Sequence, residues 1–306
     1  MTVSASQIAE FDRAHVMHPW SSLDEHEVDG PMMLFDRADG CYVYDAEGNQ
    51  FLDAIGGLWC VNVGYGRREL IDAATRQMER IPFFSSFVKH GVNTTAELAG
   101  RLAELAPGSL NHIHFTTGGS TANDSAIRLI HNYNYRRGMP DKCHVITRKD
   151  AYHGSTYLAI QLIGKEPDKV GFRFDVPWVH QVKGPNLYRR TEGTTESEWI
   201  DILAEDLEST IMRIGPENVA AFFAETVQGA GGVVVAPDGY LIRMAEICKA
   251  YDVLLVVDEV VTGFGRLGHW FSAKDKFGVQ PDIITCAKGL TSGYAPLGAT
   301  IISDEI

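Results

Sequence analysis

Five residues that could bind or transform a ligand each stand just after a stretch with the pattern of a β-strand. They are Ser120, Tyr152, Glu225, Asp258 and Lys288. They supply a hydroxyl, an aromatic ring, two carboxylates and an amine. Because parallel strands end at the same edge of a sheet, residues that follow such strands converge on one site. The chemistry therefore depends on whether these strands are parallel.

The surrounding sequence predicts such a sheet. Short apolar runs alternate with segments whose apolar residues have helical spacing, which is typical of strand–helix–strand units. The expected strands cover residues 113–115, 144–147, 219–224, 253–257, 283–284 and 299–302, and the expected helices cover about 70–78, 94–105, 119–135, 195–211 and 240–250. The run 253–257 is entirely apolar, as in strands that are buried on both faces. We therefore expect an α/β fold with a mostly parallel sheet and helices on both faces.

The first 65 residues differ from this pattern. They are rich in Pro, Gly, His and Trp and predict an irregular segment with one hairpin between Cys41 and Asp53. Further along, Thr94 precedes Glu97 by three residues, and Thr195 precedes Glu198 by three residues. Each pair predicts a capping box at the start of a helix. We expect an N-terminal segment of residues 1–65 and a main domain of residues 66–306.

Charge and cysteine usage exclude several functions. Lys and Arg number 27 against 40 Asp and Glu, so the net charge is −13, which argues against nucleic acid or an anionic membrane as a partner. No apolar run approaches the ~18 residues of a membrane span, and the N-terminus lacks a secretory signal. The five cysteines are scattered without a CxxC pair, which predicts a cytoplasmic protein without disulfides or a zinc site.

The segment around Ser120 has the character of a phosphate site. Gly118, Gly119 and Ser120 lead from a predicted strand into a predicted helix. Free backbone N–H groups and the positive end of the helix dipole favour phosphate at such a place. The alternative is an ordinary strand-to-helix turn in which Ser120 caps the helix.

Lys288 and Asp258 are informative chiefly in combination. A lysine in a partly desolvated pocket can form a Schiff base, although most lysines are solvated. A carboxylate at the end of a buried strand needs a partner, which would be either Arg266 or a ligand cation. Pyridoxal phosphate (PLP) requires a lysine for its aldehyde, a carboxylate for its pyridine nitrogen and a cup for its phosphate. The combination points to that cofactor.

Several motifs together resemble one family. They are residues 57–66, Gly119–Ser120, Tyr152–Gly154, Glu225 with Gln228–Gly229, residues 254–266 and residues 281–289. The sequence resembles class III (omega-type) aminotransferases of PLP fold type I, nearest to the omega-amino-acid and amine:pyruvate branch. The resemblance runs through essentially the whole chain. It implies transfer of an amino group from an amine or omega-amino acid to a 2-oxo acid such as pyruvate, with the amino donor left open.

The resemblance also implies roles for individual residues. Lys288 and Asp258 would be catalytic, and no metal is expected. The cofactor would be bound by Gly119, Ser120, Tyr152, His153, Glu225, Asp258, Val260 and Lys288, and the substrate by Leu58, Trp59, Phe87 and Tyr152. Residues 1–65 would belong to a small domain and the subunit interface, and the assembly would be a homodimer or homotetramer.

Three departures from the family pattern stand out. Gly118 and Thr121 replace the first Ser and the Glu of the usual Ser-Gly-Ser-Glu, and Thr226 replaces a proline. The family continues beyond the position of Ile306 into a threonine for the partner subunit's phosphate and a C-terminal small domain. We therefore expect this chain by itself to turn over little, and the alternative is an inactive domain that only binds cofactor or self-associates.

Other readings of single motifs were weighed. Gly263, Gly265 and Gly268 match the GxGxxG pattern of an NAD-dependent oxidoreductase, although no strong helix pattern follows. A serine-hydrolase elbow at Ser120 would lack its last glycine, because position 122 is alanine. His112 and His114 share one face of a strand, but no third metal ligand stands nearby in the sequence.

Overall fold

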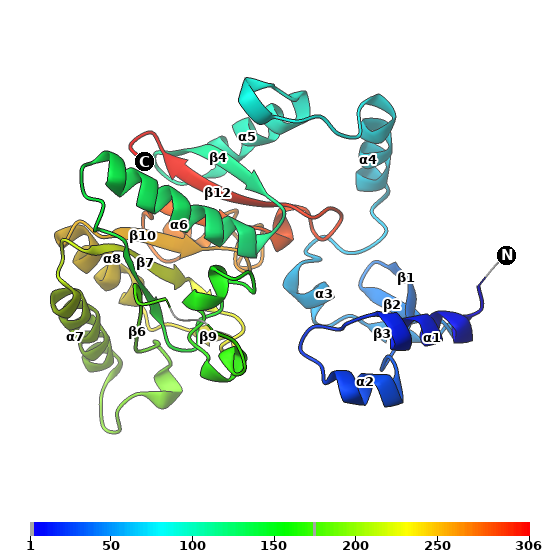
Figure 1. The fold of residues 1–306 in the computed structure, drawn as a ribbon, viewed down its shortest axis with the longest axis horizontal. Coiled ribbons are helices and arrows are strands. Elements are labelled where there is room, and N and C mark those ends of the chain that lie inside the picture. Colours follow the sequence, from blue (N-terminus) through cyan, green and yellow to red (C-terminus); the bar gives the residue numbers. More distant parts are fainter. Residues whose placement is uncertain (1–2, 174–175) are drawn as a thin grey trace. The chain divides into compact units, whose positions relative to one another are not determined.

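Seven strands form one sheet in the order β4-β12-β11-β10-β7-β5-β6 (Figure 1). In the computed structural model, which describes residues 3–173 and 176–306, they are β4 (Leu110–Thr116), β5 (His144–Arg148), β6 (Val179–Val182), β7 (Val219–Glu225), β10 (Leu254–Asp258), β11 (Ile283–Cys286) and β12 (Gly298–Ser303). The five strands from β11 to β6 are parallel, and β12 is antiparallel to both of its neighbours. The mostly parallel sheet is confirmed, and β6 is a strand that the sequence analysis missed.

Helices cover both faces of this sheet. On one face, α6 (Gly119–Arg136) packs Ile127 and Ile130 against Phe223. On the other face, α7 (Glu196–Ile214) and α8 (Tyr240–Ala250) enclose Phe222 and its neighbours. Neighbouring residues of one strand thus enter two separate cores, as the alternation of side chains along a strand requires. This explains why β7 and β10 are apolar at every position before their last residue.

The third core lies at the β4–β12 edge, where α5 (Asn93–Leu105) contributes Leu102. The capping box predicted at Thr94 is wrong. The N-cap of this helix is the extended residue Val92, whose carbonyl accepts from the Ala96 amide, so the helix begins one residue before Thr94. The second predicted box is confirmed, because Thr195 and Glu198 exchange hydrogen bonds at the start of α7.

The chain divides into two compact units, Met1–Pro82 and Phe83–Ile306. The first contains α1 (Ala5–His15), α2 (Leu23–Asp29), β1 (Phe35–Asp39), β2 (Tyr42–Asp45), β3 (Gln50–Leu52), α3 (Gly56–Trp59) and α4 (Arg68–Arg80). The hairpin β2–β3 is confirmed, whereas the expected irregularity of the N-terminus is wrong. Ser4 and Gln7 form a capping box that begins α1. The assignment of residues 1–65 and 66–306 to functional domains stays a prediction, and α4 lies in the first unit.

The second unit also contains shorter elements. They are η1 (Phe87–Lys89), η2 (Ala159–Leu162), η3 (Glu166–Lys169), η4 (Leu187–Arg189), β8 (Val227–Gln228), β9 (Val234–Val235), α9 (Ser272–Asp275) and η5 (Lys288–Leu290). Among the described residues, no helix is long and apolar enough to cross a membrane. All five cysteines are free thiols.

Candidate active site

The parallel register brings three predicted site residues to one edge of the sheet. Asp258, the last residue of β10, is paired with Glu225 at the end of β7 and with Thr285 on β11. Lys288 follows three residues after Thr285. It has a φ of 39°, a left-handed backbone conformation that residues with a side chain rarely adopt. Strain of this kind is typical of functional positions, because the surrounding structure must enforce it.

The carboxylate of Asp258 is buried and held by three donors. The Oδ2 atom lies 2.8 Å from both His153 Nδ1 and Asn123 Nδ2, and Oδ1 accepts from the Val260 amide at 2.9 Å. Because these donors come from α6, from the loop after β5 and from the second residue after β10, several segments of the sheet edge together determine the position of the carboxylate. Among the described residues, Oδ1 accepts this one bond, although each carboxylate oxygen can accept two hydrogen bonds.

His153 supports Asp258 from the loop after β5. Its ring is buried against Phe223 at a centroid distance of 5.8 Å. Its Nε2 atom is buried and has no hydrogen-bond partner in the described part of the chain. The assignment of His153 to the cofactor-binding residues stays a prediction, and its side chain contacts Asp258.

Asn123 is a site residue that the sequence analysis missed. Its Nδ2 donates to Asp258 and, at 2.7 Å, to the His153 carbonyl, while its Oδ1 accepts from Thr285 at 2.8 Å. Both hydrogens of the amide are therefore donated and its oxygen accepts one bond, so Asn123 links α6, β10 and β11. A signal exists in the sequence, because Asn123 shares the inward face of α6 with Ile127 and Ile130, where a polar residue needs a reason.

Two glycines allow the start of α6 to contact the neighbouring loops closely. A Cβ atom on Gly119 would lie 2.8 Å from the Val260 side chain, and one on Gly154 would lie 2.4 Å from Ser120 Oγ. Ser120 Oγ also accepts from the Ser155 amide at 3.2 Å. The first N–H groups of α6 thus lie at the same sheet edge as Asp258, where they suit an anionic group.

Glu225 organises the next part of this edge. Its carboxylate accepts from the Tyr152 amide at 3.2 Å and from the Gly229 amide at 3.0 Å, and its carbonyl accepts from Arg148. Burial raises the pKa of Glu225, partly offset by the positive charge of Arg148. These contacts show that Glu225 positions the loop that carries Tyr152.

Glu259, next to Asp258, has a different environment. It is fully buried on the other side of the strand end and accepts from Thr262, Ser272 and the Ala273 amide, each at 2.7 Å. Burial raises its pKa, and these hydrogen bonds oppose the shift. Glu259 therefore stabilises the segment after β10, and of the two adjacent carboxylates only Asp258 belongs to the site network.

Of the predicted substrate residues, Tyr152 donates its amide to the Glu225 carboxylate, and the other three are Leu58, Trp59 and Phe87. Leu58 and Trp59, in the first unit, have positive φ values of 69° and 63°. Phe87, in η1 of the second unit, is 78% exposed. Their assignment to a substrate pocket stays a prediction.

The rival motifs lack their expected context. Gly263, Gly265 and Gly268 lie in turns in which the Gly265 amide bonds to His269 and the Gly268 amide bonds to Gly265, so no helix begins there to receive a dinucleotide. His112 is paired with Asp304 at 2.6 Å.

Comparison with known proteins agrees with this geometry. The family model for aminotransferase class-III matches residues 24–306. The chain belongs to the class-III aminotransferase family. It is 43% identical over 294 residues to the putrescine–pyruvate aminotransferase of Pseudomonas aeruginosa, and that match covers 96% of this chain and 64% of the relative. It is 40% identical to the probable gamma-aminobutyrate transaminase 2 of Oryza sativa, covering 92% of this chain and 57% of that protein.

Solved structures show the same relation. The (S)-enantioselective omega-transaminase of Thermomicrobium roseum superposes with a TM-score of 0.96 at 45% identity, over 100% of this chain and 67% of that one. The omega-transaminase of Pseudomonas jessenii, in complex with PMP, superposes with a TM-score of 0.95 at 36% identity. That match covers 97% of this chain and 66% of that one. This class-III aminotransferase chain thus spans about two thirds of the length of these relatives or less, and the fold-type-I architecture is confirmed.

Class-III aminotransferases depend on PLP, and the residues present suit that cofactor. Asp258 offers a buried anion, as a protonated ring nitrogen requires. The start of α6 offers backbone N–H groups for a phosphate, beside a glycine position where a Cβ would collide with Val260. Lys288 offers an amine at the adjacent strand end.

Proposed function

We propose that this chain forms the larger part of a PLP-dependent transaminase, which moves an amino group from an amine or omega-amino acid to a 2-oxo acid, with pyruvate as the acceptor. The observation that carries the proposal is the Asp258 network. A buried carboxylate is held by His153 and Asn123 one strand away from Lys288.

Each proposed role follows from position. When bound, PLP supplies an aldehyde that takes up the amino group and a ring that accepts an electron pair. Lys288 Nζ would bind the aldehyde carbon and then carry a proton to or from the substrate carbon. Asp258 would hold the proton on the ring nitrogen, and Gly119 and Ser120 would bind the phosphate.

The remaining residues would shape the site around these groups. Tyr152 would cover one face of the ring and Val260 the other, with Tyr152 held in place by Glu225. Leu58, Trp59 and Phe87 would contact the substrate. The backbone strain at Leu58 and Trp59 supports this role, because strained positions cluster at ligand sites.

The class of donor is proposed from the relatives. Putrescine and gamma-aminobutyrate, named for two of them, both carry a primary amine at the end of an unbranched carbon chain. We propose donors of this class, with other omega-amino acids as weaker substrates. A cytoplasmic location stays a prediction from the sequence.

The first test is the attachment of cofactor. The protein is incubated with PLP, reduced with borohydride and digested, and the labelled peptide is identified by mass spectrometry. We expect the label on the peptide containing Lys288 and none in Lys288→Ala. Labelling of Lys165 or Lys249 instead would contradict the assignment.

The second test is turnover. Alanine formation from pyruvate is measured with putrescine, gamma-aminobutyrate, β-alanine and taurine as donors. We expect a low rate with every donor, and the first two to be the best donors. Specific labelling of Lys288 with no alanine from any donor would favour a domain that binds cofactor without catalysing transamination.

A further inference from the structure

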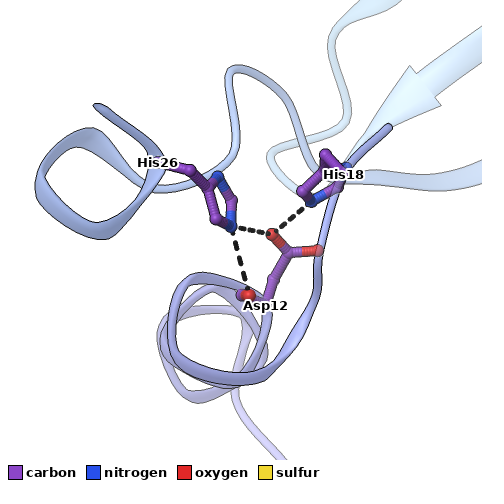
Figure 2. A group of neighbouring side chains, drawn as sticks. All are labelled: Asp12, His18 and His26. Atoms are coloured by element: carbon purple, nitrogen blue, oxygen red, sulfur yellow. Dashed lines mark hydrogen bonds and ion pairs between the residues drawn. The ribbon is translucent and has the colours of Figure 1, made fainter. Parts of the chain in front are cut away.

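Two histidines and one aspartate of the first unit meet in a single cluster (Figure 2). The Oδ1 atom of Asp12 lies 2.9 Å from His18 Nε2 and 3.3 Å from His26 Nε2. The two imidazole rings are 4.6 Å apart and steeply inclined, so both present a ring nitrogen to the same oxygen. In the described residues this is the one group of three such side chains that could hold a metal ion.

The local chain positions all three side chains. Asp12 lies in the last turn of α1, and His18 follows the end of that helix. His26 belongs to α2, which Ser22 caps through the Glu25 amide. Arg13 ties the two helices together by donating to the carbonyl of Glu27 at 2.6 Å. The three ligand atoms are thus brought together by two helices and the turn between them.

Burial of the cluster is graded. The side chain of His26 is 9% exposed and that of Asp12 is 17% exposed, whereas that of His18 is 40% exposed. His26 is also the one buried residue among the described residues of this unit. A buried polar ring in a unit without buried apolar side chains is unusual, because burying a polar group has a cost that its contacts must offset. The open side at His18 leaves room for a water molecule or an exchangeable ligand.

We propose that Asp12, His18 and His26 bind a divalent transition metal ion of the zinc type. Two imidazoles, one carboxylate and an open position are a common donor set for Zn²⁺, which tolerates mixed nitrogen and oxygen ligands. The inference is independent of the proposed transaminase function, because every ligand lies in the first unit and none belongs to the Asp258 network.

The two separations from Asp12 suit such an ion after a small adjustment, and all three ligand atoms lie within 4.8 Å of one another. Zinc–ligand bonds of about 2.0–2.2 Å in a tetrahedron place ligand atoms roughly 3.3–3.6 Å apart. The separation of 3.3 Å between Asp12 and His26 is within that range, and the 2.9 Å separation from His18 must widen by about half an ångström. His18 can make this movement because it lies outside both helices and is partly exposed. On metal binding, His26 Nε2 would exchange its contact with the Asp12 carbonyl, at 3.2 Å, for the ion.

Nearby charge favours a cation. The seven residues of α2 include four with a carboxylate side chain, namely Asp24, Glu25, Glu27 and Asp29. Arg13, the nearby cation, is paired with Glu10 at 2.7 Å. The negative potential of α2 raises the local concentration of cations and supports the choice of a divalent ion.

The experiment measures Zn²⁺ binding to the whole chain by equilibrium dialysis, and Co²⁺ binding by its visible absorption. We expect one tightly bound ion per chain. In His18→Gln and in Asp12→Asn, affinity should fall at least ~10-fold, since even changes beyond the direct ligands weaken metal sites by that much. Circular dichroism verifies that each variant is folded. His18→Gln is the primary variant because the side chain is partly exposed.

Two matched controls exclude other histidines. His15 lies at the end of α1 outside the cluster, so His15→Gln should bind Zn²⁺ as the wild type does. His144 and His180 form another close pair, with ring nitrogens 2.8 Å apart, and His180→Gln should also leave the tight site intact. X-ray absorption at the zinc edge should show nitrogen and oxygen ligands without sulfur.

Three results would overturn the proposal. They are the absence of a tight site in the wild type, equal affinity in folded His18→Gln and Asp12→Asn, and sulfur in the coordination shell, which would place the ion at a cysteine.

Discussion

Asp258 is a buried carboxylate at the centre of the proposed site. Its charge is buried, and its donors come from three separate elements. Asparagine at this position keeps the shape but removes the charge that would hold a proton on the cofactor ring. We expect Asp258→Asn to retain PLP attachment at Lys288 and to lower the transamination rate about 100-fold or more, which corresponds to about 2.7 kcal/mol. Borohydride labelling and single-turnover kinetics measure the two effects separately.

Glu259 supplies the matched control for this substitution. It is equally buried, but its hydrogen bonds go to Thr262, Ser272 and the Ala273 amide. Glu259→Gln should lower the free energy of unfolding by about 1–2 kcal/mol and leave the rate per folded molecule unchanged. If both variants lost activity in proportion to stability, Asp258 would be a structural carboxylate.

Gly154 is a position where the addition of one methyl group should affect both stability and PLP binding. It has a φ of +131°, and a Cβ there would lie 2.4 Å from Ser120 Oγ and 2.7 Å from Ser120 Cα. We expect Gly154→Ala to destabilise the protein by about 2–3 kcal/mol and to weaken PLP binding, because the loop must move away from the start of α6. Denaturant unfolding and PLP titration measure the two effects.

Gly232 is the control that distinguishes the effect of steric collision from the effect of backbone strain. It also has a positive φ, of +114°, but a Cβ on it would meet nothing within 4 Å. Gly232→Ala should therefore have the smaller effect on stability and none on PLP binding. Equal losses in the two variants would show that strain alone is responsible.

At the scale of elements, the contact between β5 and β6 depends on two stacked histidines. His144 Nδ1 and His180 Nε2 are 2.8 Å apart and their rings are stacked at 5.1 Å. Burial lowers the pKa of both rings, and the neighbouring charges of His144 and Arg213 lower that of His180 further. One of these two ring nitrogens donates a hydrogen bond and the other accepts it. The accepting ring must be neutral, so the contact requires at least one uncharged histidine.

The sign of the resulting pH dependence follows directly. A histidine whose pKa is lower in the folded state contributes stability above its unfolded value of about 6.5, and this contribution is lost as pH falls through the folded value. We expect the melting temperature to fall between about pH 7 and pH 5, and to fall less in His180→Gln. The slope that remains would come in part from His131, whose pKa is also lowered by burial. An unchanged slope in His180→Gln would contradict the role of the pair.

At the scale of the whole molecule, the two units differ in their interiors. The second has three apolar cores around the sheet, whereas His26 is the one buried residue among the described residues of the first. Local opening is easier where few apolar side chains are buried. We expect amide hydrogens of β7 and β10 to exchange slowest and those of residues 5–80 to exchange much faster. Slow exchange throughout α1 and α4 in the isolated chain would contradict this.

Assembly is the second prediction at this scale. Residues 83–88 expose four large apolar side chains, with Phe83 80%, Phe84 54%, Phe87 78% and Val88 71% exposed. Exposed apolar groups of this size are typical of interfaces. We expect light scattering to give at least twice the chain mass of 33.7 kDa, and less after Phe84→Ser and Val88→Ser. A monomer at every concentration would contradict the prediction for this chain.

The sequence by itself determined most elements of the second unit. Apolar periodicity is a local property, so six of the seven strands of the sheet, the helices α5 to α8 and the places of Asp258 and Lys288 at or after strand ends could be predicted, whereas their catalytic roles stay predictions. Local signals were also overlooked, since the capping box at Ser4 and Gln7 predicts α1. One local signal misled, because α5 begins at Asn93, one residue before Thr94, and Val92 is its N-cap.

Only the tertiary structure decided which groups act together. Asp258 and Glu259 are adjacent in sequence, and the direction of their side chains depends on how β10 lies between β7 and β11. Asn123 reaches Asp258 across 135 residues, and His26 reaches Asp12 through the turn between two helices. Contacts of this kind result from packing over long separations, which periodicity and spacing do not encode, because each residue pattern is compatible with many arrangements of the same elements.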